Sequence, residues 1–414
     1  MKIVHIITRL ILGGAQENTL LTCEGLHRRG HEVTLITGPA LGPEGELFSR
    51  ARQGGYEVIE TGCLRRAVNP LYDIPCYIKL RKLIQQINPD IVHTHSAKAG
   101  IMGRQAAAFL RKKNSASGCC CGLGKFRDAQ LASCARPVIV HTIHGLAFHR
   151  YQSSLTNRLY IAIEKHSAQQ TDAFISVAQA MTDQAVAAGL APEEKFTCIY
   201  SGMETANYLN PPSAQRIAQL RGKYDIPDDA VVIATVARLF KLKGHKYIIE
   251  AARQIVPQHK NVIWLFIGDG AWRDKLTQQT AATHLEKHFR FTGLVPPQKV
   301  GELLHISDIL LHCSLREGLA RALPQAMLCA KPVISFDVDG AAEVVFDDQT
   351  GYLVPPLDID GLINAQEKLI NDPELRQQLG LTGREKCRKM FDHNLMVDNI
   401  EQLYKFLIPD QAAL

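Results

Sequence analysis

The stretch from Ser314 to Met327 contains residue types that could bind a sugar next to a phosphate. Pro324 fits only the first turn of a helix, which predicts that a helix begins near Leu323, after an acidic loop. Free N–H groups at a helix N-terminus suit a diphosphate, while Glu317 and Gln325 offer acceptors that suit hydroxyl groups. The stretch therefore predicts a sugar-nucleotide site.

Two cations form a second candidate segment. Arg238 and Lys243 come just after a predicted strand, where both could reach a diphosphate. Charge-assisted hydrogen bonds to phosphate oxygens are about twice as strong as neutral ones, and fixed cations stabilise a leaving diphosphate as its charge grows. The alternative is a solvated basic loop, which is how we interpret the neighbouring Lys241 and Lys246.

Short β-branched runs alternate with helical stretches along the chain, which predicts parallel sheets connected by helices. The first series of strands is expected at residues 3–7, 33–37, 58–59, 91–93, 138–141 and 174–177. The second series is expected at residues 231–236, 262–267, 289–292, 309–311, 333–335 and 352–354. The predicted fold class is therefore α/β, with two doubly wound sheets.

Length and sequence breaks predict two domains. The 414 residues can form two cores of roughly 200 residues each. Consecutive prolines indicate a linker at 204–213, between an N-terminal domain at 1–203 and a C-terminal domain at 214–390. The tail, 391–414, has helical periodicity and could cross back to the N-terminal domain. Ligands of such sheets collect at the strand C-terminal ends, so we expect a cleft between the domains.

The composition narrows the class of protein. The chain has 47 Lys plus Arg against 41 Asp plus Glu, and this net charge of +6 is too small and too dispersed to indicate nucleic acid binding. No stretch approaches the roughly 18 apolar residues of a spanning helix, and His5 and Arg9 break the N-terminal apolar run. Eleven Cys without regular spacing indicate reduced thiols. These features favour a cytoplasmic enzyme.

Several motifs together resemble those of the retaining family 4 glycosyltransferases of GT-B fold, the glycosyl transferases group 1, over nearly the whole chain. In chain order they are Gly13-Gly14, HTHSAKAG at 93–100, HTIHG at 141–145, RLFKLKG at 238–244, Gly268-Asp269-Gly270, Glu317-Gly318 and GAAE at 340–343. Each motif alone has low specificity, whereas the ordered set has high specificity. The resemblance implies two Rossmann-like domains facing across a cleft, with the acceptor bound by the N-terminal domain and the nucleotide sugar by the C-terminal domain.

The resemblance also implies roles for matching residues. The expected catalytic residues are His144 and Glu317, which would contact the donor sugar, and Arg238 and Lys243, which would bind its diphosphate. The second glutamate of the family motif, which holds the ribose, is replaced here by Gln325. An amide still bonds a ribose hydroxyl, but more weakly than a carboxylate, so donor affinity is expected to fall modestly. The other expected donor-binding residues are Gly13, Gly14, Gly268, Gly270, Leu294, Gly318 and Leu319.

The N-terminal half offers weaker signals. Gly13 and Gly14 lie between the first strand and a helical stretch, where the backbone could approach a diphosphate, although a tight turn without a ligand is the alternative. The segment lacks a full Gly-x-Gly-x-x-Gly, which disfavours a nicotinamide-dependent oxidoreductase. His95 and Ser96 are candidate residues on the acceptor side.

No metal and no cofactor are expected at the site. Asp337-Val338-Asp339 resembles the Asp-x-Asp metal motif of other glycosyltransferases, but cationic side chains already supply the countercharge. His93 and His95 have no carboxylate or thiol at ligand spacing beside them. Glu343 could support the neighbouring loop or serve only as a helix-start carboxylate.

Residues 111–136 depart most from the family pattern, and we interpret them as a flexible insertion. Its cysteines, Cys119-Cys120-Cys121 and Cys134, lack the paired spacing of a zinc site, and its Gly-Leu-Gly-Lys is not a P-loop. The basic start, Arg111-Lys112-Lys113, could touch an anionic lipid surface, with a solvated loop as the alternative.

The resemblance implies a metal-independent glycosyltransferase. It would move a hexose or N-acetylhexosamine from a nucleoside-diphosphate sugar, a UDP-sugar rather than a GDP-sugar, to a hydroxyl of a lipid-linked saccharide or polysaccharide precursor. The resemblance also implies front-face transfer with retention, and this agrees with the lack of a carboxylate marked as a nucleophile in the N-terminal half. Alternatives are a non-catalytic nucleotide-sugar-binding homologue and a sugar-nucleotide epimerase of similar fold. Peripheral contact with the inner membrane surface could accompany a lipid-linked acceptor.

Overall fold

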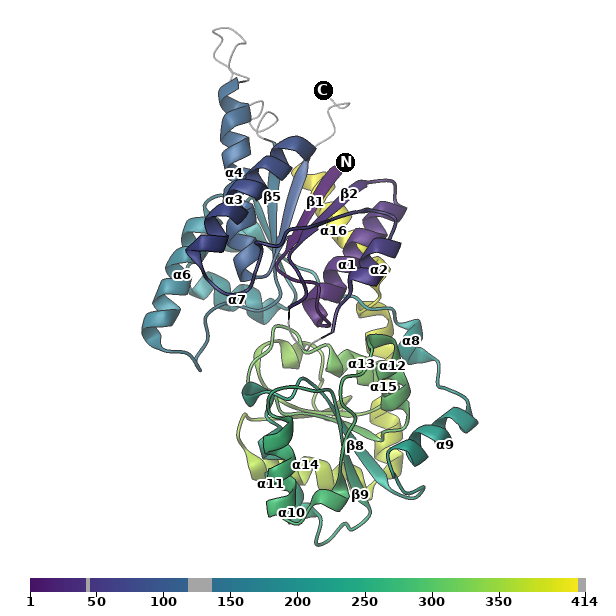
Figure 1. The fold of residues 1–414 in the computed structure, drawn as a ribbon. Coiled ribbons are helices and arrows are strands. Elements are labelled where there is room, and N and C mark those ends of the chain that lie inside the picture. Colours follow the sequence, from purple (N-terminus) through teal and green to yellow (C-terminus); the bar gives the residue numbers. More distant parts are fainter. Residues whose placement is uncertain (42–44, 118–135, 409–414) are drawn as a thin grey trace. The chain divides into compact units, whose positions relative to one another are not determined.

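The β-branched runs form the strands of two parallel sheets (Figure 1). The computed structural model describes residues 1–41, 45–117 and 136–408. The chain divides into a first unit, Met1–Gly202 with His393–Leu414, and a second unit, Met203–Asp392. Two parallel-sheet, Rossmann-like α/β units confirm the predicted fold class.

The sheet of the first unit has seven strands in the order β3-β2-β1-β4-β5-β6-β7. Their bounds are β1 (Lys2–Ile7), β2 (Glu32–Thr37), β3 (Glu57–Glu60), β4 (Ile91–His95), β5 (Val138–Ile143), β6 (Ala173–Ser176) and β7 (Phe196–Cys198). The first six match the predicted strands. The seventh, β7, was not predicted, because three residues are too few to show a period.

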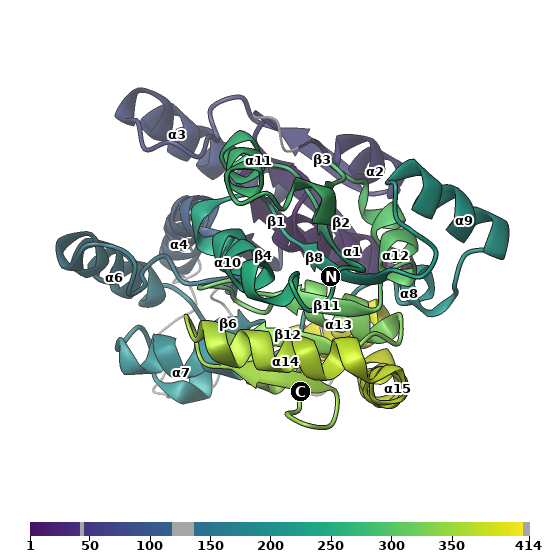
Figure 2. The ribbon, with the colours of Figure 1, turned by 90° about the horizontal axis from the view of Figure 1, so that it is seen from below.

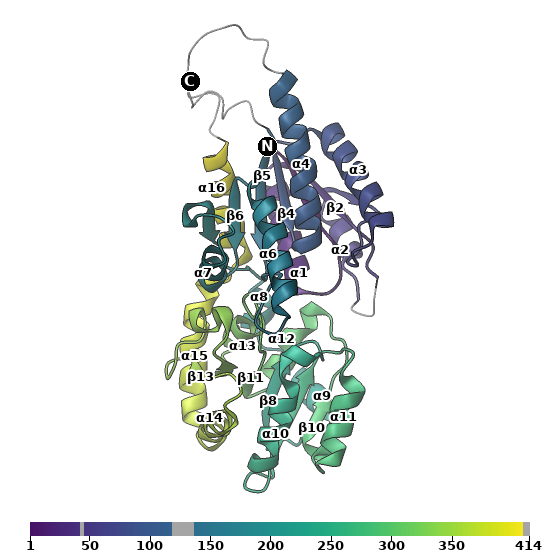
Figure 3. The same cartoon turned by 90° about the vertical axis from the view of Figure 1, so that its left-hand side faces the viewer.

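Helices pack on both faces of this sheet. They are α1 (Gly14–Arg28), α2 (Phe48–Gln53), α3 (Pro70–Ile87), α4 (Ala97–Ser117), α6 (Ser154–Ala168), α7 (Gln179–Ala187) and α16 (His393–Leu407), with the 3-10 turn η1 (Glu193–Lys195). Alternate residues of β1 point to opposite faces: Ile3 and Ile7 pack with α1 and α16, whereas Val4 and Ile6 pack with α3 and α4. Figure 3 shows α3 alongside α4.

Helix α16 packs against α1 in the first unit, although the whole second unit separates the two in sequence (Figure 1). Its apolar side, including Met396 and Tyr404, joins the core shared by α1 and the sheet. Polar contacts add to this packing, since Arg29 pairs with Asp398 at 2.6 Å. The tail helix is therefore part of the core of the first unit.

A buried ion pair joins α4 to α6. Nη2 of Arg104 lies 2.6 Å from Oε2 of Glu164, and both side chains are buried. Removing one partner of a buried pair leaves an uncompensated charge, so Arg104→Met should lower the free energy of unfolding by about 3–5 kcal/mol. Urea denaturation measures this loss, and the double variant Arg104→Met/Glu164→Leu should recover most of it. A single variant as stable as the wild type would contradict this account.

The sheet of the second unit has six strands in the order β10-β9-β8-β11-β12-β13. Their bounds are β8 (Val231–Val236), β9 (Val262–Ile267), β10 (Phe289–Phe291), β11 (Ile309–His312), β12 (Val333–Phe336) and β13 (Gly351–Val354). All six match predicted strands to within one residue at each end. The register of β8 with β9 runs from Val231 opposite Val262 to Val236 opposite Ile267.

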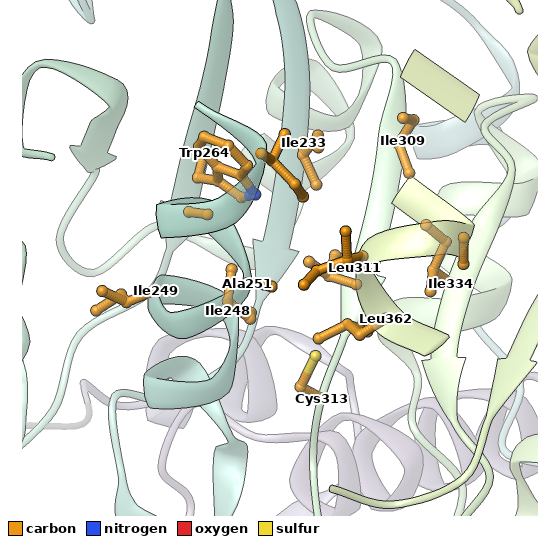
Figure 4. Packing of buried hydrophobic residues seen from close by; sticks show 14 of the residues in the cluster. Ile233, Ile248, Ile249, Ala251, Trp264, Ile309, Leu311, Cys313, Ile334 and Leu362 are labelled. Carbon is orange, nitrogen blue, oxygen red and sulfur yellow. The ribbon is translucent and has the colours of Figure 1, made fainter. Parts of the chain in front are cut away.

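The helices of the second unit are α8 (Ala206–Leu209), α9 (Ala214–Lys223), α10 (His245–Ile255), α11 (Arg273–Ala282), α12 (Pro297–His305), α13 (Ala322–Leu328), α14 (Ile359–Asn371) and α15 (Pro373–Met390), with 3-10 turns η2 (Lys241–Lys243), η3 (Glu286–His288) and η4 (Asp339–Glu343). Figure 2 shows α10 and α14 side by side. Their apolar residues join Trp264 and Leu311 of the sheet in one core, drawn in Figure 4. Burial of these aliphatic and aromatic side chains stabilises the unit and fixes the strand ends that carry the site.

Two expectations about irregular segments were wrong in part. Residues 204–213 contain helix α8, because the prolines at 211 and 212 follow that helix and do not interrupt it. The basic start of the expected insertion belongs to α4, which runs to Ser117. Arg111 bonds both carboxylate oxygens of Asp172, at 2.8 and 2.7 Å, and is not a solvated loop residue. The cysteines at 119–121 and 134 lie outside the described residues.

Candidate active site

The loop between β11 and α13 carries Glu317, and its carboxylate accepts hydrogen bonds from two elements of the second unit. Nζ of Lys243, from η2, donates to Oε1 of Glu317. Nε2 of His312, the last residue of β11, lies 3.2 Å from the same oxygen. An ionised carboxylate only accepts, so His312 donates from Nε2. Lys243, His312 and Glu317 therefore form one polar cluster at the C-terminal ends of β8 and β11.

The charge state of Glu317 follows from this cluster. Burial by itself would raise the pKa of Glu317, but the nearby Lys243 ammonium and the bond from His312 overcome that effect and hold the pKa well below its usual range. Glu317 is therefore an ionised carboxylate at neutral pH, with both oxygens able to accept hydrogen bonds.

A glycine brings Lys243 to Glu317. Gly244 has φ +74, and a Cβ on it would lie 1.8 Å from the carbonyl oxygen of Cys313. Only glycine allows this close approach of the β8–α10 loop to the residue after β11. The close backbone packing places Lys243 against the loop that follows Cys313.

Gly268 and Gly270 also serve local packing. Gly268 has φ +140, and a Cβ there would lie 2.2 Å from the carbonyl oxygen of Ala237. A Cβ on Gly270 would lie 2.6 Å from the carbonyl oxygen of Leu239. These glycines let the loop after β9 lie against the loop that carries Arg238.

Among the described residues, no hydrogen bond or ion pair joins Arg238 to the cluster of Lys243, His312 and Glu317. Its side chain is exposed, and its guanidinium stacks over the ring of Phe240 at 5.1 Å from the centroid. Cation–π stacking of this kind holds the guanidinium at the end of β8 without burying its charge. Leu294, after β10, is also exposed, whereas Leu319 is buried.

Helix α13 begins at Ala322, which confirms the predicted start near Leu323 with Pro324 in the first turn. Gln325 is not an exposed first-turn residue. It is buried, and its Nε2 donates to Oη of Tyr208 at 2.9 Å. One N–H of this amide is therefore engaged inside the second unit.

Sequence reasoning missed two residues that support Glu317. The predicted strand ended at residue 311 and His312 was given no role, although its position five residues before Glu317 was a signal available in the sequence. Asp339 was dismissed as incidental in the Asp-x-Asp motif, yet its Oδ2 accepts from the backbone N–H of Glu317 at 2.7 Å. In addition, the backbone N–H of Gly340 donates to the carbonyl oxygen of Gly318 at 3.4 Å. Asp339 thus fixes the backbone of the Glu317 loop.

In the first unit, α1 begins at Gly14 with Gly13 as its N-cap residue. Gly13 has φ 179, an extended conformation that any residue can adopt. A glycine here is therefore not required by the backbone angle. The first turn of the 15-residue helix α1 nevertheless presents its N–H groups next to these two glycines.

Five histidines gather along β1, β4 and β5 and just after β5, also in the first unit. Nδ1 of His5 lies 3.0 Å from Nε2 of His95, and Nδ1 of His95 lies 3.2 Å from Nε2 of His144. His93 bonds Thr142 and Tyr404, and His141 bonds Thr94. The structure thus connects His144 to His95 but places both in a network of rings.

Burial sets the protonation of these rings. It lowers the pKa of His5 to about 3 and the pKa values of His93, His95 and His141 well below the usual 6.5. These four histidines are therefore neutral at neutral pH.

His5, His93 and His95 could supply nitrogen ligands to a metal ion, since their ligand atoms lie within 4.8 Å of one another. In the structure both nitrogens of His93 and of His95 are already engaged in hydrogen bonds.

Ser96 follows β4 in a left-handed backbone conformation, with φ +62. Its Oγ lies 2.8 Å from Oγ1 of Thr8, and its carbonyl oxygen accepts from the N–H of Gly100 at 2.8 Å. Ser96 therefore ties the end of β1 to the start of α4.

No helix among the described residues is long and apolar enough to cross a membrane.

Two family models match the two halves of the chain. Residues 13–202 match the glycosyl transferase 4-like domain, and residues 216–386 match the glycosyl transferases group 1. Among curated proteins, the chain is 26% identical over 98% of its length to the UDP-Gal:alpha-D-GlcNAc-diphosphoundecaprenol alpha-1,3-galactosyltransferase of Escherichia coli, of which the match covers 96%. It is also 26% identical to the N-acetyl-alpha-D-glucosaminyl L-malate synthase of Bacillus anthracis, over 93% of this chain and 92% of that protein.

Solved structures show the same fold. Anabaena Alr3699/HepE in complex with UDP and glucose has a TM-score of 0.79 at 21% identity, covering 98% of this chain and 100% of that one. The sucrose-phosphate synthase of Thermosynechococcus elongatus has a TM-score of 0.77 at 19% identity, covering 100% of both chains. With both halves of the chain matched, this protein belongs to the glycosyl transferases group 1 family and is a glycosyltransferase of GT-B fold.

Proposed function

We propose that this enzyme transfers a hexose or N-acetylhexosamine from a UDP-sugar to a hydroxyl of a lipid-linked saccharide, with retention of the anomeric configuration. The cluster of Lys243, His312 and Glu317 carries the proposal, because it combines a cation for a diphosphate with an ionised acceptor for sugar hydroxyls. The donor class is supported by the UDP and glucose in the Anabaena structure. The acceptor class is supported by the diphosphoundecaprenol named for the Escherichia coli relative.

In the proposed reaction the bond between the sugar C1 and the diphosphate oxygen breaks, and a bond from C1 to the acceptor oxygen forms on the same face. The proton of the acceptor hydroxyl passes to the departing diphosphate. Nζ of Lys243 carries three hydrogens, of which one is directed to Glu317, so the others can meet phosphate oxygens as negative charge develops. Arg238 would add a second cation, and Glu317 would orient the sugar.

The remaining site residues are assigned by the same proposal. His144 would bind a hydroxyl of the donor sugar or the departing phosphate, and Gln325 would bind the ribose. Backbone groups at Gly13, Gly14, Gly318 and Leu319 would approach the donor, and those around Leu294 would bind the base. His95 and Ser96 would lie toward the acceptor. Because Gln325 also bonds Tyr208, we expect it to contribute only modestly to the affinity for the ribose.

The proposal is tested by incubating the enzyme with a panel of UDP-sugars and GDP-sugars and an undecaprenyl-diphosphate-linked N-acetylglucosamine, and by assigning the new linkage by NMR. We expect an α-linked product from an α-linked UDP-sugar. A β-linked product would contradict retention, isomerised donor without acceptor would indicate an epimerase, and nucleotide binding without turnover would indicate a non-catalytic homologue.

Metal independence gives a separate prediction. Because cationic side chains supply the countercharge to the diphosphate, transfer should keep its rate in excess EDTA, within about twofold of the untreated enzyme. The rate is compared before and after dialysis against chelator, with added manganese as the control. Loss of transfer on chelation and its recovery with manganese would reject this prediction.

A further inference from the structure

Helix α3 is apolar on two opposite sides. Cys76, Leu80 and Ile84, four residues apart, are fully buried and pack in the core that α4 and the sheet share. Leu71 and Ile74, which lie on the other side by the 100° rotation per residue, are 82% and 61% exposed.

The exposed side forms a continuous strip. Ile78 continues it at 46% exposed, and Val68, just before the helix, is 81% exposed. We call Val68, Leu71, Ile74 and Ile78 the α3 apolar strip. Several aliphatic side chains at helical spacing on one exposed face are more than the scattered apolar residues of an ordinary surface.

Basic residues lie near this strip along the chain. From Gly62 to Pro89 the chain has five basic residues against one acidic residue. The basic residues are Arg65, Arg66, Lys79, Arg81 and Lys82. The acidic residue, Asp73, lies 2.5 Å from Nζ of Lys98, so its charge is neutralised locally. The segment that carries the strip is therefore positively charged.

We propose that the α3 apolar strip docks on an anionic lipid bilayer, with its aliphatic side chains in the interfacial region and the surrounding lysines and arginines on the headgroups. An exposed helix face that carries aliphatic residues, with basic residues in the same segment, has the composition of a surface that binds at a lipid interface. A lipid surface also requires no matching polar groups in the strip, and its four residues offer none. The inference extends the proposed function, because a lipid-linked acceptor would be reached from such a surface.

The test is flotation of the full chain with vesicles of phosphatidylcholine alone or with about 30 mol% phosphatidylglycerol, which supplies the anionic headgroups. We expect binding to the anionic vesicles that weakens in high salt. The triple variant Leu71→Ser/Ile74→Ser/Ile78→Ser and the charge variant Lys79→Gln/Lys82→Gln should each bind at least about tenfold more weakly. The control variant Leu155→Ser/Leu159→Ser changes two exposed leucines of α6, 78% and 59% exposed, and should bind like the wild type.

Binding of UDP, measured by calorimetry, keeps this inference separate from the proposed function, because the donor cluster lies in the second unit and UDP binding should survive in the triple variant. The inference would be overturned if the wild-type protein did not bind anionic vesicles, or if the triple variant bound them as strongly as the wild type. A wild-type dimer that dissociates in the triple variant would also overturn it, by assigning the strip to a second copy of the chain.

An independent observation concerns His144. Two hydrogen bonds link His5, His95 and His144 in a row, and neutral His5 and His95 each carry one N–H. With both bonds made, the N–H groups all point toward His144 or all point away from it. In the second case His5 would hold a buried N–H on Nε2, an atom with no partner among the described residues. An unpaired buried N–H is rarer than an unpaired acceptor, so the first arrangement is favoured.

The geometry points to His5 and His95 as positioning residues that hold His144 as the tautomer with its proton on Nδ1. His95 then donates from Nδ1 to Nε2 of His144, and His144 presents an N–H donor to whatever meets its Nδ1. This assigns hydrogen-bond donation, rather than acceptance of a hydroxyl proton, to His144.

The test is ¹⁵N NMR of selectively labelled histidines, with the His144 ring assigned by the loss of its signals in His144→Gln. We expect the Nδ1–H tautomer in the wild type and loss of that preference in His95→Leu. His93→Gln, a change in the same cluster but outside the row, should leave the tautomer unchanged. The Nε2–H tautomer in the wild-type protein would overturn the inference without any variant.

Discussion

Replacing Lys243 with alanine should lower kcat/KM for transfer by about a thousandfold or more. The substitution removes the ammonium that bonds Glu317 and that we assign to the leaving diphosphate. Loss of one fixed group that stabilises developing charge costs about a hundred- to a thousandfold, and the loss of the partner of Glu317 adds to it. The measurement is the initial rate of transfer with the UDP-sugar identified by the donor panel.

Lys241→Ala is the matched control, because Lys241 lies in the same 3-10 turn but is exposed. It should transfer at the wild-type rate. Thermal unfolding of both variants separates loss of the site from loss of the fold. Full activity in a folded Lys243→Ala enzyme would show that the cluster is not the site.

Glu317→Ala should lower kcat/KM for transfer by about as much as Lys243→Ala does. Glu317 is ionised because Lys243 and His312 stabilise its charge, and this carboxylate is the group we assign to the donor sugar. Glu317→Gln should also lose most activity, since an amide cannot accept with the strength of a carboxylate. Glu250→Ala, a change at an exposed residue of α10, serves as the control and should stay active.

The same carboxylate predicts how stability changes with pH. The pKa of Glu317 is lower in the folded chain than its unfolded value of about 4.3, so its contribution to stability is present above about pH 4.3. That contribution is lost as the pH falls from there toward the depressed folded pKa. Urea denaturation between about pH 5 and pH 3 should therefore show a steeper loss for the wild type than for Glu317→Gln. Parallel losses would contradict the assigned charge state.

The fold was largely predictable because its strands are buried on both faces. Runs such as Val231–Val236 and Val262–Ile267 are apolar throughout, which is the pattern of a parallel strand between two layers of helices. Short elements were not predictable. Strand β7 has three residues, and helix α8 has four residues beside two prolines, so neither shows a period.

The candidate site was predictable where a residue of suitable chemistry directly follows a predicted strand. Lys243 and Glu317 were named because a cation and an acid each follow a strand, and the structure brings them together. Asp339 was not named, because its role depends on how two loops approach each other, and His312 was not named although it lies five residues before Glu317. Asp339 accepts from the backbone of Glu317, a contact between residues 22 positions apart that no local pattern records.

Calorimetric titration with UDP-sugars tests the central claim most directly, because it reports on the donor site whether or not the acceptor is known. The wild-type enzyme should bind a UDP-sugar, and Lys243→Ala should bind it at least about tenfold more weakly, since charge-assisted bonds to phosphate are lost. Binding of equal strength in Lys243→Ala and wild type, or no binding of any nucleotide sugar to the wild type, would contradict a donor site built on Lys243 and Glu317.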